Sequence, residues 1–177
     1  MALVFQYGSN MSVARLNGAY RLAGDAKPVY VARTTEPFDL MFTVWSKSNN
    51  CAAADLVSGS TGRNIYGVVY EIPEFLLSRD TAKQRNRKSL DAIEGEGTNY
   101  VRTMIDLTKN DGSTIRAITY VVKARKTGIK TSLAYVRHIL LGLKEHGIPG
   151  EYCQYVRSKI VENNHELENG LLANDDF

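Results

Sequence analysis

The chain has little cysteine, little net charge and no long hydrophobic run. Cys51 and Cys153 are its two cysteines, so we expect unpaired thiols in a reducing compartment rather than a disulfide-stabilised fold. The 22 Lys and Arg exceed the 19 Asp and Glu only slightly, and a net charge of +3 does not by itself indicate nucleic-acid binding. No secretory signal pattern is visible, and no apolar run approaches membrane-spanning length. We therefore expect a soluble, cytoplasmic protein with no nucleic-acid and no membrane partner.

Sequence motifs for metals and common cofactors are missing as well. His138, His146 and His165 show no metal-binding spacing, and there is no Cys-x-x-Cys pair. The sequence also lacks a Gly-x-Gly-x-x-Gly fingerprint, a P-loop and a Gly-x-Ser-x-Gly nucleophile elbow. We expect no metal and no cofactor.

What the sequence does contain is a set of segments typical of β-strands. Apolar and polar residues alternate, or β-branched and aromatic residues cluster, in six of them. The expected strands are residues 3–5, 29–33, 40–45, 65–72, 101–107 and 115–121. Asn110-Asp111-Gly112 lies between the last two and predicts a hairpin. Residues 49–64 are small and polar, and we expect a loop or a ragged sheet edge there.

Helical periodicity dominates the C-terminal third. One helix is expected over residues 133–143, with Gly147 as its cap and Pro149 as its stop, and a second over residues 152–160. Shorter helices are expected at 12–16, 73–79 and 87–93. Because the strands follow one another with helices inserted, the order predicts an α+β fold, a small twisted β-barrel with flanking α-helices. We assign residues 1–163 to this domain and residues 164–177 to an acidic, poorly ordered tail.

The first candidate site is the corner Tyr7-Gly8-Ser9-Asn10, which follows the apolar residues 3–5. Gly8 permits a close approach or a positive φ, and Ser9 and Asn10 favour turns and helix N-caps. A corner of this kind can bind a carboxylate, a phosphate or a developing oxyanion through its backbone N–H groups. An ordinary tight turn is the alternative.

The second candidate site is Glu94, at the end of an expected short helix. Gly95 and Gly97 allow a sharp turn into the next strand. A carboxylate at such a junction, beside apolar Leu90 and Ile93, can be partly buried, which raises its pKa toward neutrality. The alternative is that Glu94 and nearby Glu96 are solvated loop charges.

A basic run could in principle contact phosphates. It comprises Arg79, Lys83, Arg85, Arg87 and Lys88. We favour the alternative that these residues form a solvated segment before a helix.

Several of these segments, taken in order, resemble the γ-glutamylcyclotransferase-like superfamily, which includes AIG2-like proteins. The matching segments are Tyr7-Gly8-Ser9-Asn10, residues 67–72, Leu90-Asp91-x-x-Glu94-Gly95 with Tyr100, Ala117-x-Thr119-Tyr120, and residues 135–152 with Glu145-His146-Gly147-Ile148-Pro149. The resemblance covers residues 4–160. It departs from the expected pattern in residues 47–63, a region that shapes the substrate pocket in the family.

The resemblance implies an enzyme that cyclises a γ-glutamyl group to 5-oxoproline and releases an amine or amino acid. It implies that Glu94 is the general base and acid. The implied substrate-binding residues are Tyr7, Gly8, Ser9, Asn10, Tyr100, Tyr120 and Tyr135. The expected partner is a small γ-glutamyl compound whose leaving group the sequence does not name. A non-catalytic binding module on the same fold is the alternative, and a homodimer is left open.

Overall fold

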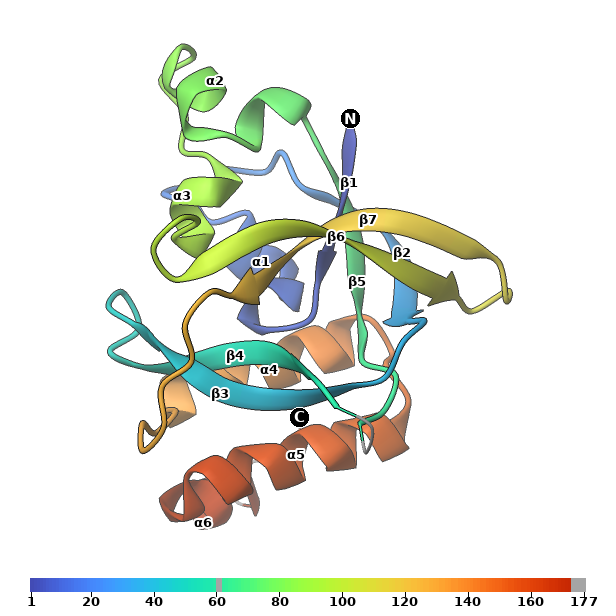
Figure 1. Ribbon diagram of the computed structural model, residues 1–177, viewed down its shortest axis with the longest axis vertical. Helices are drawn as coiled ribbons and strands as arrows, with labels where there is room; N and C mark the ends of the chain where they lie inside the picture. The colour runs from blue at the N-terminus through green and yellow to red at the C-terminus, as the bar shows by residue number, and fades with distance from the viewer. Residues whose placement is uncertain (60–61, 173–177) are drawn as a thin grey trace.

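Five strands of the computed structural model, which describes residues 1–59 and 62–172, close into a barrel (Figure 1). Its strand order is β1 (Ala2–Gln6), β5 (Tyr66–Ile72), β2 (Lys27–Thr34), β6 (Tyr100–Lys109), β7 (Thr114–Val122). β1 runs antiparallel to β5 and meets β7 in parallel at Val4 and Ile118, which closes the barrel. The expected α+β barrel is thus confirmed.

The hairpin between β6 and β7 forms where its turn residues predict it. The two strands pair from Tyr100 with Val122 to Thr108 with Thr114. Gly112 has a φ of +83°, a conformation that glycine adopts without steric cost. Both strands place apolar residues such as Leu107 and Ala117 in the buried core.

A separate two-stranded sheet of β3 (Phe38–Ser46) and β4 (Cys51–Ser58) lies beside the barrel (Figure 1). The expectation of a loop or ragged edge at residues 49–64 was therefore wrong for β4, which is a regular strand whose first six residues are buried. β4 is rich in alanine, a residue depleted in strands, so its sequence carries a weak strand signal. Its pairing with β3 and its burial decide its structure.

The helices cover the barrel and the two-stranded sheet from opposite sides. The short helices α2 (Arg79–Lys83) and α3 (Leu90–Glu94), with the 3-10 turn η2 (Glu74–Leu76), lie at one end of the barrel (Figure 1). The long helices α4 (Leu133–Glu145) and α5 (Gly150–Asn163) lie on the other side, next to β3 and β4. Between them the chain turns at Gly147, which has a φ of +59° as expected of a C-terminal glycine.

Secondary structure continues into the C-terminal segment. Residues His165–Leu167 form a 3-10 turn, η3, and Glu168–Leu172 form α6. Leu171 is buried. The expectation of a poorly ordered tail stays a prediction. Residues 173–177 lie outside the described residues.

Two further observations bear on the chemistry. Cys51 is buried, Cys153 is partly buried, and both are free thiols. Within residues 1–59 and 62–172, no helix has the length and apolarity required to cross a membrane.

Candidate functional site

The Tyr7–Asn10 corner connects β1 to α1 (Val13–Leu16) through the 3-10 turn η1 (Ser9–Met11). Gly8 has a φ of −109°, so of the two roles expected for it, close approach is the one observed. A Cβ added there would lie 3.3 Å from Ala54 Cβ and 3.6 Å from the Tyr135 hydroxyl. The N-cap of α1 is Ser12, whose Oγ accepts from the Arg15 backbone N–H at 3.4 Å. The side chains of Ser9 and Asn10 are therefore not needed to cap the helix and can face the pocket.

The C-terminal half of α4 holds this corner in place. Gly142 packs against the backbone of Met11, with no room for a larger residue. Glu145 Oε2 accepts from the Val13 backbone N–H at 3.0 Å, and His146 Nε2 lies 3.0 Å from the Met11 carbonyl oxygen. The Glu-His-Gly segment noted in the sequence is therefore a support for the corner.

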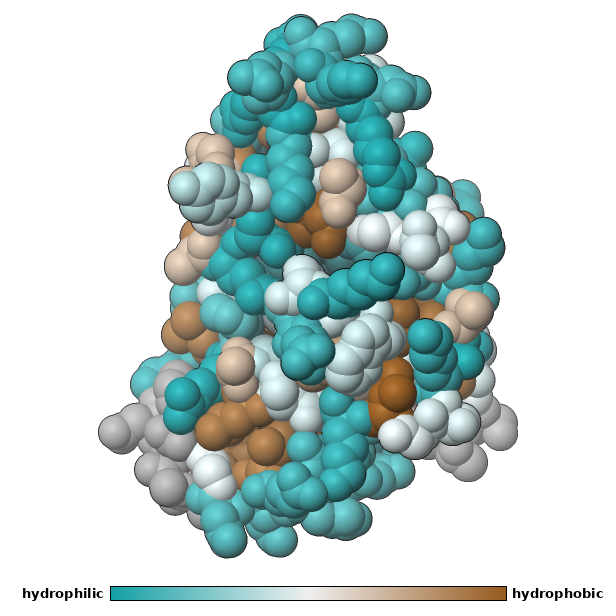
Figure 2. All heavy atoms as spheres, turned by 90° about the vertical axis from the view of Figure 1, so that its left-hand side faces the viewer, coloured by the Kyte–Doolittle hydropathy of each residue, from teal (hydrophilic) through white to brown (hydrophobic). Residues whose placement is uncertain are grey.

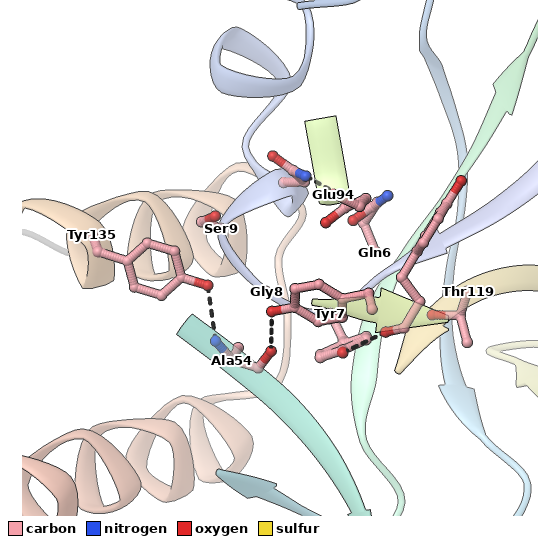
Figure 3. Close-up of a pocket in the computed structure, with 11 residues that line it drawn as sticks. Gln6, Tyr7, Gly8, Ser9, Ala54, Glu94, Thr119 and Tyr135 are labelled. Atoms are coloured by element: carbon pink, nitrogen blue, oxygen red, sulfur yellow. Dashed lines mark hydrogen bonds between the residues drawn. The ribbon is translucent and has the colours of Figure 1, made fainter. Parts of the chain in front are cut away.

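Glu94 ends α3 and directs its carboxyl group into the pocket beside the corner (Figure 3). Gly95, with a φ of +70°, and Gly97, with a φ of +82°, turn the chain from α3 into β6. Asn10 Nδ2 donates to Glu94 Oε1 at 2.7 Å. Burial raises the pKa of Glu94, and hydrogen bonding from Asn10 and the charge of Arg21 partly offset this rise.

Glu96 lies in a different environment, although it is only two residues away. Its Oε2 accepts from Arg79 Nη1 at 3.1 Å, and its side chain is 32% exposed. It does not line the pocket. Of the two carboxylates that the sequence left open, Glu94 is thus the one that faces the pocket, and Glu96 forms a surface ion pair.

The four tyrosines proposed from the sequence form the walls of the pocket, and their hydroxyls bond to protein groups. Tyr7 donates to the Tyr120 carbonyl, and Tyr120 donates to Asp91 Oδ1, both at 2.7 Å. Tyr100 donates to the Ala54 carbonyl at 2.7 Å. The Tyr135 hydroxyl accepts from the Ala54 N–H at 3.0 Å (Figure 3). These bonds fix the tyrosine rings in place.

The pocket has two connected parts. An inner cavity of about 30 Å³ is lined by all eight residues predicted from the sequence. An outer cleft of about 310 Å³ shares five of its lining residues with the inner cavity: Ser9, Asn10, Glu94, Tyr100 and Tyr135. The outer cleft lies where α3 approaches the turn between β3 and β4, on a largely hydrophilic face of the molecule (Figure 2).

Several pocket residues were not expected from the sequence. Ala54 contributes backbone groups, for which residue type gives no signal, and Arg15 and Arg21 carry no recognisable motif. Gln6 and Thr119 point from the barrel strands into the inner cavity. Thr119 lies within a segment that matched the superfamily, and that match was the one available signal for it.

The basic run is mostly engaged with the protein itself. Arg79 pairs with Glu96, Arg85 lies 4.3 Å from the ring centroid of Phe75, and Arg87 pairs with Asp25 at 2.5 Å. Among the residues that the structure describes, no group of three or more His, Cys, Asp or Glu is arranged to hold a metal ion.

The closed barrel with its flanking helices defines a γ-glutamylcyclotransferase-like fold. The family model for the AIG2-like family matches residues 64–156, more than half of the chain. The protein belongs to the AIG2-like family.

Solved structures agree on the fold. A protein described as "Gamma-glutamyl cyclotransferase" is 24% identical, with 88% of this chain and 86% of that chain covered and a TM-score of 0.71. The Homo sapiens protein described as uncharacterized protein loc79017 is 26% identical over 88% and 86%, with a TM-score of 0.72. YkqA from Bacillus subtilis is 22% identical over 90% of this chain but only 54% of its own length, with a TM-score of 0.69. No curated protein matches the sequence.

Proposed function

We propose that the protein cyclises a γ-glutamyl group to 5-oxoproline and releases an amine or amino acid. In this reaction the α-amine of the glutamyl group attacks its own γ-carbonyl carbon. A new C–N bond closes the five-membered lactam, and the C–N bond to the leaving amine breaks. Counted from the ammonium form of the substrate, the attacking nitrogen loses two protons and the leaving nitrogen, released as an ammonium, gains two, so the reaction is balanced without water.

The observation that carries this proposal is the Glu94 carboxyl group, which lies partly buried against the Tyr7–Asn10 corner and is bonded to Asn10. In its ionised form, a carboxyl group with a raised pKa can accept a proton from the attacking nitrogen and then, as the neutral acid, give it to the leaving nitrogen. General base and then general acid are thus roles of the same residue. Asn10 Nδ2 holds one carboxyl oxygen and so sets the direction of the group.

The rest of the pocket supports a tethered reaction. The nucleophile and the electrophile belong to one molecule, and well-oriented reactions of this kind reach effective molarities of about 10⁵–10⁸ M. In the proposal, Tyr7, Gly8, Ser9 and Asn10 bind the glutamyl group, and the tyrosine walls restrict its conformations. The backbone N–H groups of the corner are the candidates for binding a carboxylate or the oxyanion.

The test compares two glutamates that lie two residues apart. We expect Glu94→Gln to lower 5-oxoproline release by about 10²–10⁴-fold, the usual contribution of a general acid–base group. Glu96→Gln is the matched control: it removes an exposed ion pair with Arg79 and is expected to keep most of the activity. Circular dichroism spectra of both variants would show that the fold is intact. Equal losses in the two variants would contradict the role assigned to Glu94.

The same assay separates an enzyme from a binding module. Calorimetric titration with a panel of γ-glutamyl compounds measures binding, and 5-oxoproline release measures turnover. If compounds of the panel bind but none of them is turned over, the non-catalytic module would be favoured.

A further inference from the structure

The outer cleft carries an excess of positive charge next to Glu94. Its lining includes three cationic side chains, Arg15, Arg21 and Lys47, and one acidic side chain, Glu94. Lys47 is exposed at the rim, whereas Arg15 and Arg21 are partly buried. Both arginines line the outer cleft and neither lines the inner cavity.

Both arginines are held by neutral groups. Arg15 Nε donates to Ser9 Oγ at 3.1 Å, and Arg15 Nη2 donates to Asn49 Oδ1 at 2.7 Å. Arg21 Nη2 donates to Asn10 Oδ1, and Arg21 Nε is buried without a hydrogen-bond partner. Among the described residues neither arginine has a carboxylate within ion-pair distance. A guanidinium offers five N–H donors, so both retain donors for a ligand.

The two guanidinium groups lie close enough for the charge of Arg15 to act on Arg21. Burial lowers the pKa of both, and the charge of Arg15 lowers that of Arg21 further, whereas the charge of Glu94 raises both. Neighbouring like charges of this kind are stabilised by an anion between or beside them, and the planar fork of arginine suits a carboxylate. The cleft is thus arranged to receive an anionic group.

We propose that Arg15 and Arg21 bind a carboxylate on the leaving group, so that the preferred substrates are γ-glutamyl amino acids or peptides rather than γ-glutamyl amines. This inference rests on the proposed function. With Glu94 ionised, the two arginines and Glu94 together carry one net positive charge. A γ-glutamyl amine is a zwitterion with no net charge, whereas a γ-glutamyl amino acid carries one net negative charge and neutralises the cleft.

The position of the two arginines indicates that they contact the leaving group rather than the glutamyl group. Glu94 borders both parts of the pocket, so the reacting amine and carbonyl lie where they meet. A glutamyl group bound against Ser9, Asn10 and Glu94, which border both parts of the pocket, can direct its leaving group into the outer cleft, toward both guanidiniums. Asn49, which holds Arg15, belongs to the region of the sequence that departs from the superfamily pattern.

The test uses two substrates that differ by one carboxylate, γ-glutamylalanine and γ-glutamylethylamine. We expect the wild-type kcat/KM for γ-glutamylalanine to be at least about tenfold higher, and this preference to fall with ionic strength. Arg15→Gln and Arg21→Gln should each reduce the preference toward one. Lys47→Gln, at the exposed rim, is the control and should change it less than about threefold.

The ratio of the kcat/KM values for the two compounds, rather than the rate for either compound, tests the proposal. Arg21→Gln also removes the bond to Asn10, so it lowers turnover of both compounds, but only loss of carboxylate binding changes their ratio. An unchanged ratio in both arginine variants, or a wild-type preference for γ-glutamylethylamine, would overturn the proposal. Calorimetric dissociation constants for the two compounds on Glu94→Gln give the same comparison without turnover. Absence of 5-oxoproline with both compounds would instead count against the proposed function.

Discussion

Replacing Gly142 by alanine tests whether α4 positions the Tyr7–Asn10 corner. A Cβ at Gly142 would lie 2.5 Å from Met11 Cβ and 2.9 Å from the Met11 carbonyl carbon and the Ser12 nitrogen. Ordinary van der Waals contact begins at 3.4 Å, so α4 and the corner must separate by about 0.9 Å. The opposing atoms are backbone or adjacent to it, and no side-chain rotation can relieve the contact.

Two effects of opposite sign determine the change in stability. Alanine favours the helix by about 0.5–1 kcal/mol over glycine, whereas overpacking a buried contact costs about 1–3 kcal/mol. The two ranges give a net loss of about 0–2.5 kcal/mol, centred near 1 kcal/mol, which lowers the Tm of a chain of this size by a few degrees. A displacement near 1 Å at Asn10, the neighbour of Met11, should lower kcat/KM by up to about 100-fold.

Thermal unfolding and steady-state 5-oxoproline release measure these two effects. Gly150→Ala is the matched control, because Gly150 begins α5 and a Cβ there meets no atom within 4 Å. This control should raise the Tm slightly or leave it unchanged. If Gly142→Ala behaved like Gly150→Ala in both measurements, the role given to α4 would be refuted.

Two further predictions concern the partly buried Glu94 and the fully buried Asp55. Burial raises the pKa of Glu94 above its ordinary value of 4.5, so the folded protein should lose stability as the pH rises from 4.5 through the raised pKa. Glu94→Gln should therefore have a higher Tm than the wild type at pH 8. Below pH 4.5 the two Tm values should be the same. Asp55 accepts from Thr43 Oγ1, the Val122 N–H and Arg125 Nε. In urea unfolding, Asp55→Ala should cost about 1–3 kcal/mol for each donor that is left buried and unpaired. Asp106→Ala removes an exposed ion pair and should cost less than about 1 kcal/mol. Equal Tm values at pH 8, or similar costs for the two aspartates, would contradict these expectations.

Elements with strong periodicity were predictable from the sequence. The β6–β7 hairpin, α4 and α5 combine a clear apolar pattern with a specific turn or cap residue, and each forms where expected. β4 was missed because its alanines become buried only when β3 and the pocket walls pack against them. Asp55, which ties β4 to the end of β7 through the Val122 N–H, looks like an ordinary loop charge in the sequence.

The candidate site was likewise predictable from the sequence only in part. The Tyr7–Asn10 corner and Glu94 lie 84 residues apart, and local sequence suggested a site at each without showing that they meet. Only the resemblance to a known superfamily brought them together before the structure did. Ala54 could not be predicted by either route, because it acts through its backbone N–H and carbonyl.

The hydrogen bonds of the tyrosines explain why the proposed acid–base role falls on Glu94. Tyr7, Tyr100 and Tyr120 donate their hydroxyl protons to protein acceptors, and burial raises the pKa of all three phenols above the usual range. The pKa of Tyr135 is also raised by burial. These groups move away from neutral pH, whereas burial moves the pKa of Glu94 toward it. Among the side chains lining the inner cavity, the same desolvation thus removes the tyrosines as proton carriers and favours the carboxyl group.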